Sequence, residues 1–364
     1  MSRKNPVELE NKTVLVTGSA GFIGSNLVLE LLETQSPIRI IGLDNMNDYY
    51  DVGIKEWRLR EIEQCLLRHS DSSYIFFRDD LANKAVIDQI FEKYCPDIVV
   101  NLAAQAGVRY SITNPDAYIQ SNLIGFYNIL EACRHSYDKG ARGVEHLVYA
   151  SSSSVYGTNK KVPYSTEDKV DNPVSLYAAT KKSNELLAHA YSKLYNIPST
   201  GLRFFTVYGP AGRPDMAYFG FTDKLLRGET IRIFNYGNCQ RDFTYVDDIV
   251  EGVKRVMRGA PERKAGEDGL PLPPYAIYNI GNSDPVNLLD FVDILQQELI
   301  RAKVLPEDYD FEAHKELVPM QPGDVPVTYA DTQPLQQDYG FKPNTPLREG
   351  LRKFATWYKE FYRI

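Results

Sequence analysis

Short apolar runs rich in β-branched residues alternate with helix-like segments through the first two-thirds of the chain. The apolar runs are nearly continuous, a pattern typical of strands that are buried on both faces of a parallel sheet. They cover residues 13–18, 38–44, 97–103 and 146–152. The helix-like segments between them include residues 25–33, 86–94 and 117–135. Strand–helix alternation with short connections predicts an α/β fold with a doubly wound parallel sheet.

The alternation weakens after about residue 208. The segments recognisable there are a stretch rich in glycine, proline and charge at 263–275, which predicts an exposed excursion, and amphipathic helices at 287–300 and 346–362. We therefore expect a first domain over 11–207, with a return to it near 240–260. A smaller, interleaved C-terminal α/β lobe is expected to take up most of 208–364.

The charge balance excludes two classes of partner. The 364 residues carry a net charge of −7, and the isoelectric point lies near 5.4, whereas a protein that binds nucleic acid or an anionic membrane needs a basic face. The first residues hold no apolar stretch typical of a signal peptide. No apolar run reaches the roughly 20 residues that a membrane-spanning helix needs. We expect no nucleic-acid partner and no membrane partner.

The four cysteines, Cys65, Cys95, Cys133 and Cys239, are widely spaced, with no C-x-x-C pair among them and no clustered histidines. This spacing argues against a zinc site and against a disulfide framework, and it fits free thiols in a reducing compartment. We therefore expect no bound metal and a cytoplasmic location.

A glycine-rich turn follows the first predicted strand. Gly18, Gly21 and Gly24 permit a tight turn and a close backbone approach to a pyrophosphate, and the helix that starts there offers free N–H groups. Asp44 ends the second predicted strand, where its carboxylate can accept hydrogen bonds from ribose hydroxyls and would repel a 2′-phosphate. The pattern predicts a Rossmann-type domain that binds NAD rather than NADP. The alternative is a purely structural glycine turn with Asp44 as a solvated strand cap.

Two other strand ends carry polar groups. Asp80 and Leu81 follow a third strand-like run, and they either flank the adenine or form an exposed turn. Four consecutive serines, Ser151–Ser154, end the strand at 146–152. The carboxyl edge of a doubly wound sheet is where such folds bind ligands, so a serine there can hold a sugar hydroxyl.

Tyr177 and Lys181 are four residues apart in a segment that Ser175 can cap as a helix, so both side chains lie on one helix face. The same spacing at Tyr156 and Lys160 encloses a glycine in a predicted loop and is interpreted as coincidence. A phenol with a pKa near 10 is a poor base at neutral pH. We expect the Lys181 ammonium and a cationic nicotinamide to stabilise the Tyr177 phenolate.

With these residues in view, the chain resembles an extended short-chain dehydrogenase/reductase of the nucleotide-sugar epimerase type. The similarity runs through "VTGSAGFIG", "NLAAQAGVRYS", "SSSSVYG", "SLYAATKKSNE", "GLRFFTVYGP", "RDFTYVDDIV" and "QPGDVP", and it is greatest to the UDP-glucuronate 4-epimerases. The resemblance implies that Tyr177 is the base, that Lys181 is its partner and a ribose contact, and that Ser152 is the hydroxyl partner.

The resemblance also implies oxidation of a UDP-sugar at carbon 4 by NAD, rotation of the 4-keto sugar and return of the hydride to its opposite face. It further implies a homodimer that packs through helices at 117–133 and 176–195. The implied NAD-binding residues are Gly18, Gly21, Phe22, Ile23, Gly24, Asp44, Asn45, Asp80, Leu81, Leu102, Ala103, Ala104, Gln105, Asn122, Ala150, Ser151, Tyr177, Lys181 and Phe204.

The substrate residues follow from the same resemblance and from the chemistry of a 4-keto uronate. Ser153 and Ser154 stand where related dehydratases carry an Asp-Glu pair and where related decarboxylases carry a glutamate at the second position, so this chain lacks those acids. An epimerase must hold the sugar carboxylate, because a β-keto acid otherwise loses carbon dioxide. Besides Ser152 and Tyr177, the candidate substrate residues are Ser153, Ser154, Thr206, Arg109, Arg213, Arg232, Phe234 near the uracil, Arg241 at the diphosphate, Gln321 and Asp324.

Several alternatives remain open at this point. Arg109 could be a loop arginine paired to an acid, and Arg241 and Phe234 could have core or surface roles. Gln321 replaces an arginine that galactose epimerases often carry. The rival activities are a neutral UDP-sugar 4-epimerase and a UDP-glucuronate decarboxylase, and the rival class is a non-catalytic NAD-binding scaffold. The segments 136–145 and 262–274 are interpreted as surface insertions without an assigned function.

Overall fold

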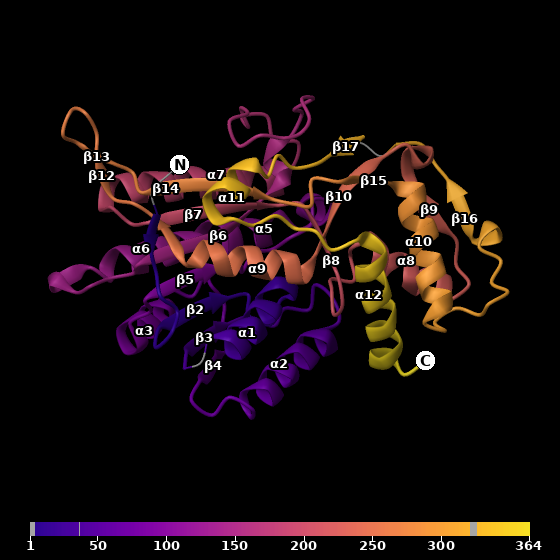
Figure 1. Cartoon of the computed structure of the whole chain (residues 1–364), viewed down its shortest axis with the longest axis horizontal. Helices are drawn as coiled ribbons and strands as arrows, with labels where there is room; N and C mark the ends of the chain where they lie inside the picture. Colours follow the sequence, from indigo (N-terminus) through magenta and orange to yellow (C-terminus); the bar gives the residue numbers. More distant parts are fainter. Residues whose placement is uncertain (1–3, 36, 321–325) are drawn as a thin grey trace.

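A seven-stranded parallel sheet forms the centre of the molecule (Figure 1). The computed structural model describes residues 4–35, 37–320 and 326–364. The strand order is β14-β7-β6-β5-β2-β3-β4, and every neighbouring pair is parallel. The strands are β2 (Thr13–Thr17), β3 (Arg39–Leu43), β4 (Ser73–Phe77), β5 (Ile98–Asn101), β6 (His146–Ser152), β7 (Ser199–Phe204) and β14 (Tyr275–Ile280). The predicted doubly wound sheet is confirmed.

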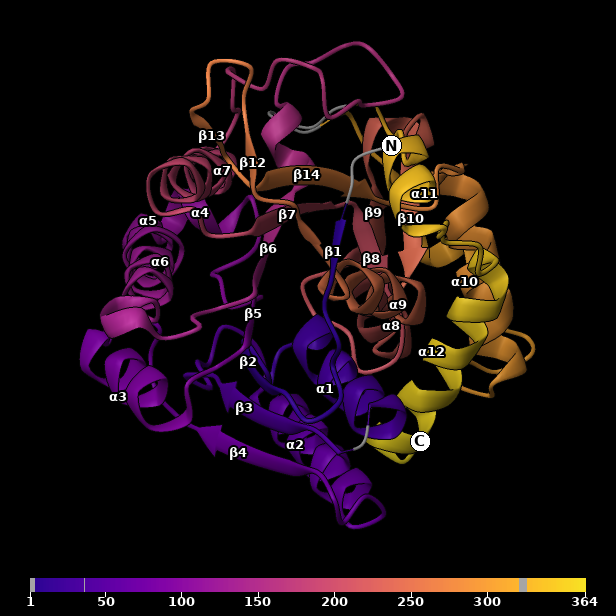
Figure 2. The same cartoon turned by 60° about the vertical axis from the view of Figure 1, so that its left-hand side comes forward.

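Helices cover both faces of this sheet (Figure 2). One face carries α1 (Phe22–Thr34), α2 (Val52–Leu66) and α9 (Val246–Met257), and the other carries α3 (Lys84–Tyr94), α6 (Gly125–His135) and α7 (Leu176–Tyr195). Successive residues of a strand point to opposite faces, so Val14 and Val16 belong to the core under α1 whereas Leu15 belongs to the core under α3 and α6. Burial on both faces explains why the strands are continuous apolar runs.

The segment predicted as helical at 117–135 forms one continuous helical stretch that contains a π-helical turn. It consists of α5 (Pro115–Tyr118), a π-helical turn η1 (Ile119–Ile124) and α6. A π-turn adds a residue to the turn and shifts the face on which the following side chains lie. Here Asn122 is buried, accepts a hydrogen bond from Gln105 N at 2.8 Å and donates to Thr180 Oγ1 at 3.0 Å. The predicted helix is therefore present, and the π-turn inside it is a feature that hydrophobic periodicity does not signal.

The smaller lobe is built around β10 (Gln240–Tyr245), which pairs with β8 (Thr206–Tyr208), β15 (Pro285–Asn287) and β17 (Val327–Thr328). Its helices α8 (Ala217–Leu226), α10 (Leu288–Arg301) and α12 (Leu347–Tyr362) pack through aromatic side chains that include Phe219, Phe354 and Tyr358. After residue 208 the chain returns twice to the large sheet, as α9 and as β14. The domain boundaries given above stay a prediction.

Short elements complete the described chain. They are β1 (Lys4–Pro6), α4 (Tyr110–Thr113), η2 (Asp138–Gly140), η3 (Ser153–Tyr156), β9 (Ile231–Ile233), η4 (Phe234–Gly237), β11 (Gly259–Pro261), β12 (Lys264–Ala265), β13 (Pro271–Leu272), η5 (Glu312–His314), β16 (Lys315–Leu317) and α11 (Gln333–Tyr339). The excursion at 263–275 is an exposed β12–β13 hairpin, as predicted. None of the helices in the described ranges is long and apolar enough to cross a membrane.

Candidate active site

A cavity lies at the carboxyl ends of the central strands, where β2, β3, β5 and β6 run into their following loops. This is the edge at which doubly wound folds bind ligands. The sequence-predicted cofactor residues that line the cavity are Gly18, Gly21, Phe22, Ile23, Gly24, Asp44, Asn45, Asp80, Leu81, Leu102, Ala103, Ala104, Gln105, Ala150, Ser151, Tyr177, Lys181 and Phe204. Asn122 lies behind this lining and holds Gln105. The structure thus brings residues from almost the whole first domain to one place.

The glycine-rich turn between β2 and α1 has no room for side chains. Gly18 has φ +69°, and a Cβ there would lie 2.8 Å from Ala103 N. A Cβ on Gly24 would lie 2.1 Å from Gly18 O, so this glycine is required for the close packing of helix and turn. The N-terminus of α1 faces the cavity with free N–H groups, which is the arrangement that holds a pyrophosphate. The turn therefore fits NAD.

Asp44 is fixed at the end of β3 with its carboxylate at the cavity wall. It accepts hydrogen bonds from Ala20 N at 3.2 Å and from Met46 N at 2.9 Å. Lys55 Nζ lies 3.9 Å from it, and burial lowers the pKa of Lys55 although Asp44 opposes that shift. The sequence analysis missed Lys55, because a lysine in the first turns of α2 has no spacing signal. A backbone-anchored carboxylate at this position is the feature expected for the ribose of NAD.

Asp80 lies at the same wall of the cavity and accepts hydrogen bonds from its neighbours. Its Oδ2 accepts a hydrogen bond from the Asn45 side chain at 2.8 Å, and its Oδ1 accepts one from Ala82 N at 2.8 Å. Leu81 is buried beside it and packs under Gly125. Both Asp80 and Leu81 line the cavity, so the half-buried wall position replaces the exposed-turn alternative.

Tyr177, Lys181 and Ser152 meet where β6 ends beside α7. The Ser175 hydroxyl caps α7 by accepting a hydrogen bond from Ala178 N at 3.1 Å. The Ser152 hydroxyl is hydrogen-bonded to the Tyr177 phenol. Lys181 is buried, and its Nζ donates to Ala150 O at 2.9 Å. The three residues that the sequence assigned to the chemistry thus share one corner of the cavity.

The pKa values in this corner are set mainly by burial. Burial raises the pKa of Tyr177, and the hydrogen bond from Ser152 and the positive charge of Arg213 oppose that shift. Burial lowers the pKa of Lys181 to about 8. We expected the Lys181 ammonium to stabilise the phenolate. In the structure the charge that acts in that sense comes from Arg213, while Lys181 is bound to the strand carbonyl.

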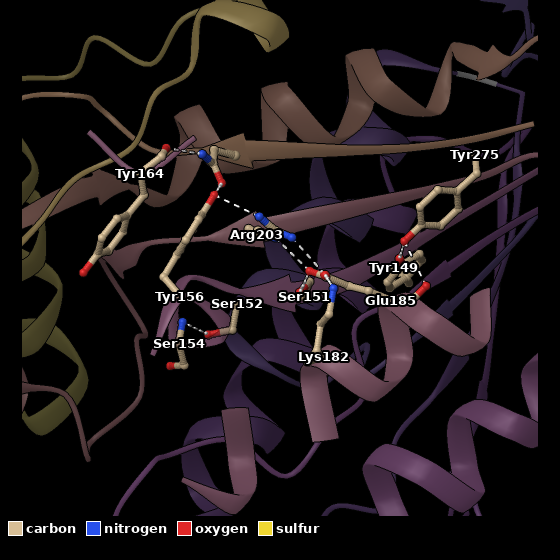
Figure 3. A network of polar contacts seen from close by, with 11 residues as sticks. Tyr149, Ser151, Ser152, Ser154, Tyr156, Tyr164, Lys182, Glu185, Arg203 and Tyr275 are labelled. Carbon is tan, nitrogen blue, oxygen red and sulfur yellow. Dashed lines mark hydrogen bonds and ion pairs between the residues drawn. The ribbon is translucent and has the colours of Figure 1, made fainter. Parts of the chain in front are cut away.

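A buried polar network fixes α7 to the sheet behind this corner (Figure 3). Glu185 Oε1 accepts hydrogen bonds from Ser151 Oγ at 2.7 Å and from Arg203 Nε at 2.8 Å, and its Oε2 accepts one from Arg203 Nη2 at 2.9 Å. Arg203 Nη1 donates to the Tyr156 hydroxyl at 3.0 Å, which donates to Asn279 Oδ1 at 2.7 Å. The network joins α7, β6, β7 and β14. Sequence reasoning missed it because the contacts join residues far apart in the chain.

The two residues of the second Tyr-x-x-x-Lys pattern, Tyr156 and Lys160, do not lie in one site. Tyr156 is buried in η3 within the network of Figure 3, and its ring stacks on Tyr164. Lys160 is exposed in the following loop. The interpretation of this spacing as coincidence agrees with these positions.

The predicted substrate residues are placed less uniformly. Arg213 lines the cavity, whereas Ser153, Ser154 and Thr206 are half-buried next to its lining. The exposed Arg109 has its guanidinium 5.5 Å from the centre of the Phe234 ring, and within the described residues it forms no ion pair with an acid. The structure therefore brings Arg109 and Phe234 together, but neither residue lines the cavity.

The remaining predicted substrate residues lie further out in the smaller lobe. Arg232 is exposed and pairs with Glu316 at 3.1 Å, so the structure does not bring it to the cavity. Arg241 is the second residue of β10 and donates from Nη1 to Gln240 O at 3.0 Å. Gln321 and Asp324 lie outside the described residues. The described part of the chain holds no cluster of side chains suited to a metal ion.

The fold and the cavity together define an NAD-dependent enzyme of the extended short-chain dehydrogenase/reductase superfamily. The model of the NAD dependent epimerase/dehydratase family matches residues 14–281. Protein CapI of Staphylococcus aureus is 48% identical over 96% of this chain and 99% of its own length. UDP-glucuronate 4-epimerase 4 of Arabidopsis thaliana is 44% identical over 96% of this chain and 76% of its own.

Solved structures give the same class. The UDP-glucuronic acid 4-epimerase from Bacillus cereus in complex with UDP-glucuronic acid and NAD is similar with a TM-score of 0.79 at 30% identity, over 96% of this chain and 100% of that one. The UDP-glucose 4-epimerase from Thermotoga maritima with UDP-glucose has a TM-score of 0.77 at 27% identity, over 96% and 99%. The chain belongs to the NAD dependent epimerase/dehydratase family. It is an isomerase whose cofactor is NAD.

Proposed function

We propose that this NAD-dependent UDP-sugar 4-epimerase interconverts UDP-glucuronate and UDP-galacturonate. The observation that carries the proposal is the cationic Arg213 at the cavity corner that holds Tyr177 and Ser152. A neutral sugar has no group that needs a guanidinium there, whereas a uronate carboxylate matches it in charge and in planar geometry. Relatives named as UDP-glucuronate 4-epimerases support the same substrate.

The chain's own residues account for the proton transfer. Ser152 is placed to hold the 4-hydroxyl of the sugar against Tyr177, whose phenolate takes the hydroxyl proton and later returns it. When bound, NAD supplies the hydride acceptor and donor for carbon 4 and a positive charge beside the phenol. Burial raises the pKa of Tyr177, and Ser152 and Arg213 oppose that rise, so both residues favour the phenolate that the proton transfer needs.

The serines at the end of β6 bear on the choice between epimerisation and decarboxylation. Ser154 N donates to Ser152 Oγ at 3.1 Å, so this turn positions the hydroxyl partner and presents no carboxylate. An acid at Ser153 or Ser154 would be needed to move further protons on the intermediate. Ser153 and Ser154 present hydroxyls in place of such an acid, which favours retention of the sugar carboxylate.

The test is to incubate the purified protein with UDP-glucuronate without added reductant and to follow the products by proton NMR. A mixture with UDP-galacturonate and little pentose is the expected result. UDP-xylose or a 4-keto pentose as the main product would replace the proposal with a decarboxylase. Conversion of UDP-glucose and not of UDP-glucuronate would replace it with a neutral-sugar epimerase. Binding of NAD and sugar without any conversion would favour the non-catalytic scaffold.

We further propose a homodimer that packs through α6 and α7. Ile124 at the end of η1, Tyr127 on α6, and Leu186 and Leu194 on α7 are large apolar side chains that are exposed in the single chain. A pair of adjacent helices with such a face is a typical homodimer surface. Sedimentation analysis of the wild type and of a Leu186→Glu/Leu194→Glu variant tests this, since the variant should sediment as a monomer. The cytoplasmic location stays a prediction.

A further inference from the structure

The partner of Arg213 is a partly exposed carboxylate beside the cavity lining. Arg213 Nε donates to Asp215 Oδ1 at 3.0 Å, and Nη2 donates to Asp215 Oδ2 at 2.5 Å. Asp215 Oδ2 also accepts a hydrogen bond from the Tyr49 hydroxyl at 3.1 Å. The side chains of Arg213 and Asp215 are 25% and 27% exposed, so the pair is accessible to a ligand. The guanidinium is therefore bound by a carboxylate, which is also the group that a uronate would bring.

Three loops meet at this pair. Tyr49 comes from the loop between β3 and α2, and its ring lies against that of Tyr110 with centroids 4.6 Å apart. Gly107, with φ +101°, passes so close that a Cβ there would lie 2.8 Å from the Tyr49 hydroxyl and 3.6 Å from Asp215 Oδ2. Arg213 and Asp215 come from the loop that follows β8. The first two loops belong to the cofactor domain and the third leads into the smaller lobe.

The other cations of the cavity have partners that a substrate cannot replace. Among the described lining residues, Lys55, Lys181 and Arg213 carry positive charge. Lys55 Nζ donates to Asn47 O at 2.9 Å, and Lys181 Nζ donates to Ala150 O at 2.9 Å. Both lysines are buried and bound to backbone carbonyls. Lys55 also lies 3.9 Å from the buried Asp44, whereas Arg213 makes two hydrogen bonds to a carboxylate that is 27% exposed. Among these three cations, Arg213 is therefore the one that can exchange one carboxylate for another.

A bidentate arginine raises a difficulty for an epimerase, because the 4-keto sugar must rotate within the site. Charge-assisted paired hydrogen bonds hold a carboxylate strongly, and a ring that rotates must carry its carboxylate away from them. Releasing it would leave a half-buried guanidinium without an anion, which is costly. An alternative carboxylate next to the guanidinium removes most of that cost.

We propose that Asp215 is the exchange partner of the substrate carboxylate on Arg213, and that Tyr49 holds Asp215 while it is displaced. This proposal rests on the proposed function. Asp215 releases Arg213 when the uronate binds and takes it back when the sugar rotates. The Tyr49 hydroxyl keeps a hydrogen bond on Asp215 in both arrangements. Asp215 and Tyr49 are thus positioning residues that act through Arg213, and they set the preference for uronate over neutral sugars.

Two substitutions should act in opposite directions on binding. Asp215→Asn removes the competing carboxylate, so UDP-glucuronate should bind roughly tenfold more tightly while its kcat falls, because rotation now requires an unassisted release. Tyr49→Phe keeps the ring against Tyr110 and removes the hydrogen bond to the displaced Asp215. UDP-glucuronate should then bind a few-fold more weakly. Structural damage would weaken binding in both variants, so opposite directions separate the proposal from a merely structural role.

The measurement is the ratio of the Kd of UDP-glucuronate to that of UDP-glucose, by titration calorimetry on the NAD-loaded protein, together with kcat and KM. Asp48→Asn is the matched control. Asp48 is exposed on the same loop as Tyr49, carries the same charge as Asp215 and, among the described contacts, makes no hydrogen bond to Arg213. It should leave the ratio within twofold of the wild type. Asp215→Asn should lower the ratio and Tyr49→Phe should raise it, with the UDP-glucose Kd little changed.

An unchanged ratio in Asp215→Asn would overturn the proposal, as would a change equal to that of Asp48→Asn. If Asp215→Asn does not fold, Tyr49→Phe decides, and an unchanged ratio there overturns it as well. If the wild type converts UDP-glucuronate but both variants have the same Kd ratio as the wild type, the exchange on Arg213 is refuted and the proposed function still stands. A wild type that binds UDP-glucose and not UDP-glucuronate defeats the proposed function, and the exchange on Arg213 with it.

Discussion

The buried pair of Arg203 and Glu185 offers a quantitative test of how the site is held in place (Figure 3). The two side chains are 3% and 1% exposed. Arg203→Met keeps most of the volume and removes three hydrogen bonds, two to Glu185 and one to the Tyr156 hydroxyl. Glu185 would keep Ser151, and Lys182 at 3.4 Å, as partners. A buried carboxylate would thus lose its strongest counter-charge.

The expected loss follows from the burial of the pair. Removing one partner of a buried ion pair costs about 3–5 kcal/mol, because the other charge is left buried and uncompensated. Replacing both partners with apolar residues of similar volume is often close to neutral. We therefore expect Arg203→Met to lower the free energy of unfolding by about 3–5 kcal/mol, and Arg203→Met/Glu185→Met to recover most of that loss.

The pKa of Glu185 adds a second readout. Burial by itself raises this pKa, but the hydrogen bonds and charge of Arg203 outweigh burial and lower it below its ordinary value of 4.5. A lowered carboxyl pKa stabilises the fold above the unfolded pKa, and this contribution disappears as the pH falls through the folded pKa. Without Arg203 the pKa rises, so Glu185 can be protonated in the fold. The difference in free energy of unfolding between the wild type and Arg203→Met should therefore become smaller from pH 7 toward pH 4.

Urea denaturation followed by far-ultraviolet circular dichroism, at pH 7 and near pH 4, gives these free energies. A loss below about 1 kcal/mol in Arg203→Met would refute the reasoning. So would a double variant that loses as much free energy of unfolding as Arg203→Met and Glu185→Met do together, because the two residues would then not act as a pair.

Further predictions concern the cofactor, the base and a buried histidine. Tyr177→Phe should lower turnover by at least about 100-fold while NAD stays bound, and near-normal turnover would show that another group is the base. Asp44→Ala should weaken NAD more than UDP-glucuronate in titration calorimetry, whereas equal weakening would contradict the cofactor assignment. Gly24→Ala should also weaken NAD, since its Cβ would lie 2.1 Å from a backbone oxygen of the turn; unchanged NAD affinity would show that the turn can adjust. Burial lowers the pKa of His146 from 6.5 to about 4. As the pH falls, the unfolded chain therefore binds a proton at His146 before the folded chain does, and the free energy of unfolding should drop by about 3 kcal/mol between those two pH values. A His146→Gln variant with the same pH dependence would rule this out.

The parts of the site that lie within one segment were predictable. The glycine turn, Asp44 at a strand end and the Tyr177–Lys181 pair each rest on a fixed spacing within one strand, turn or helix. The residues that the sequence analysis missed, among them Lys55 and Asp215, act through partners from other segments. Arg232 shows the converse, because a basic residue in a promising stretch lies on the surface against Glu316.

The sequence by itself determined the layered α/β fold and the NAD-binding turn, since hydrophobic periodicity and local spacing act over a few residues and survive any arrangement of the rest. The role of Tyr177 as the base stays a prediction that rests on the family resemblance. The tertiary structure decided which charge reaches the phenol. Burial sets the pKa of Tyr177 and of Lys181, and the opposing charge comes from Arg213, which lies 36 residues away in sequence. Coulombic and hydrogen-bond energies depend on distance and solvent exposure in space, and no pattern along the chain contains either quantity.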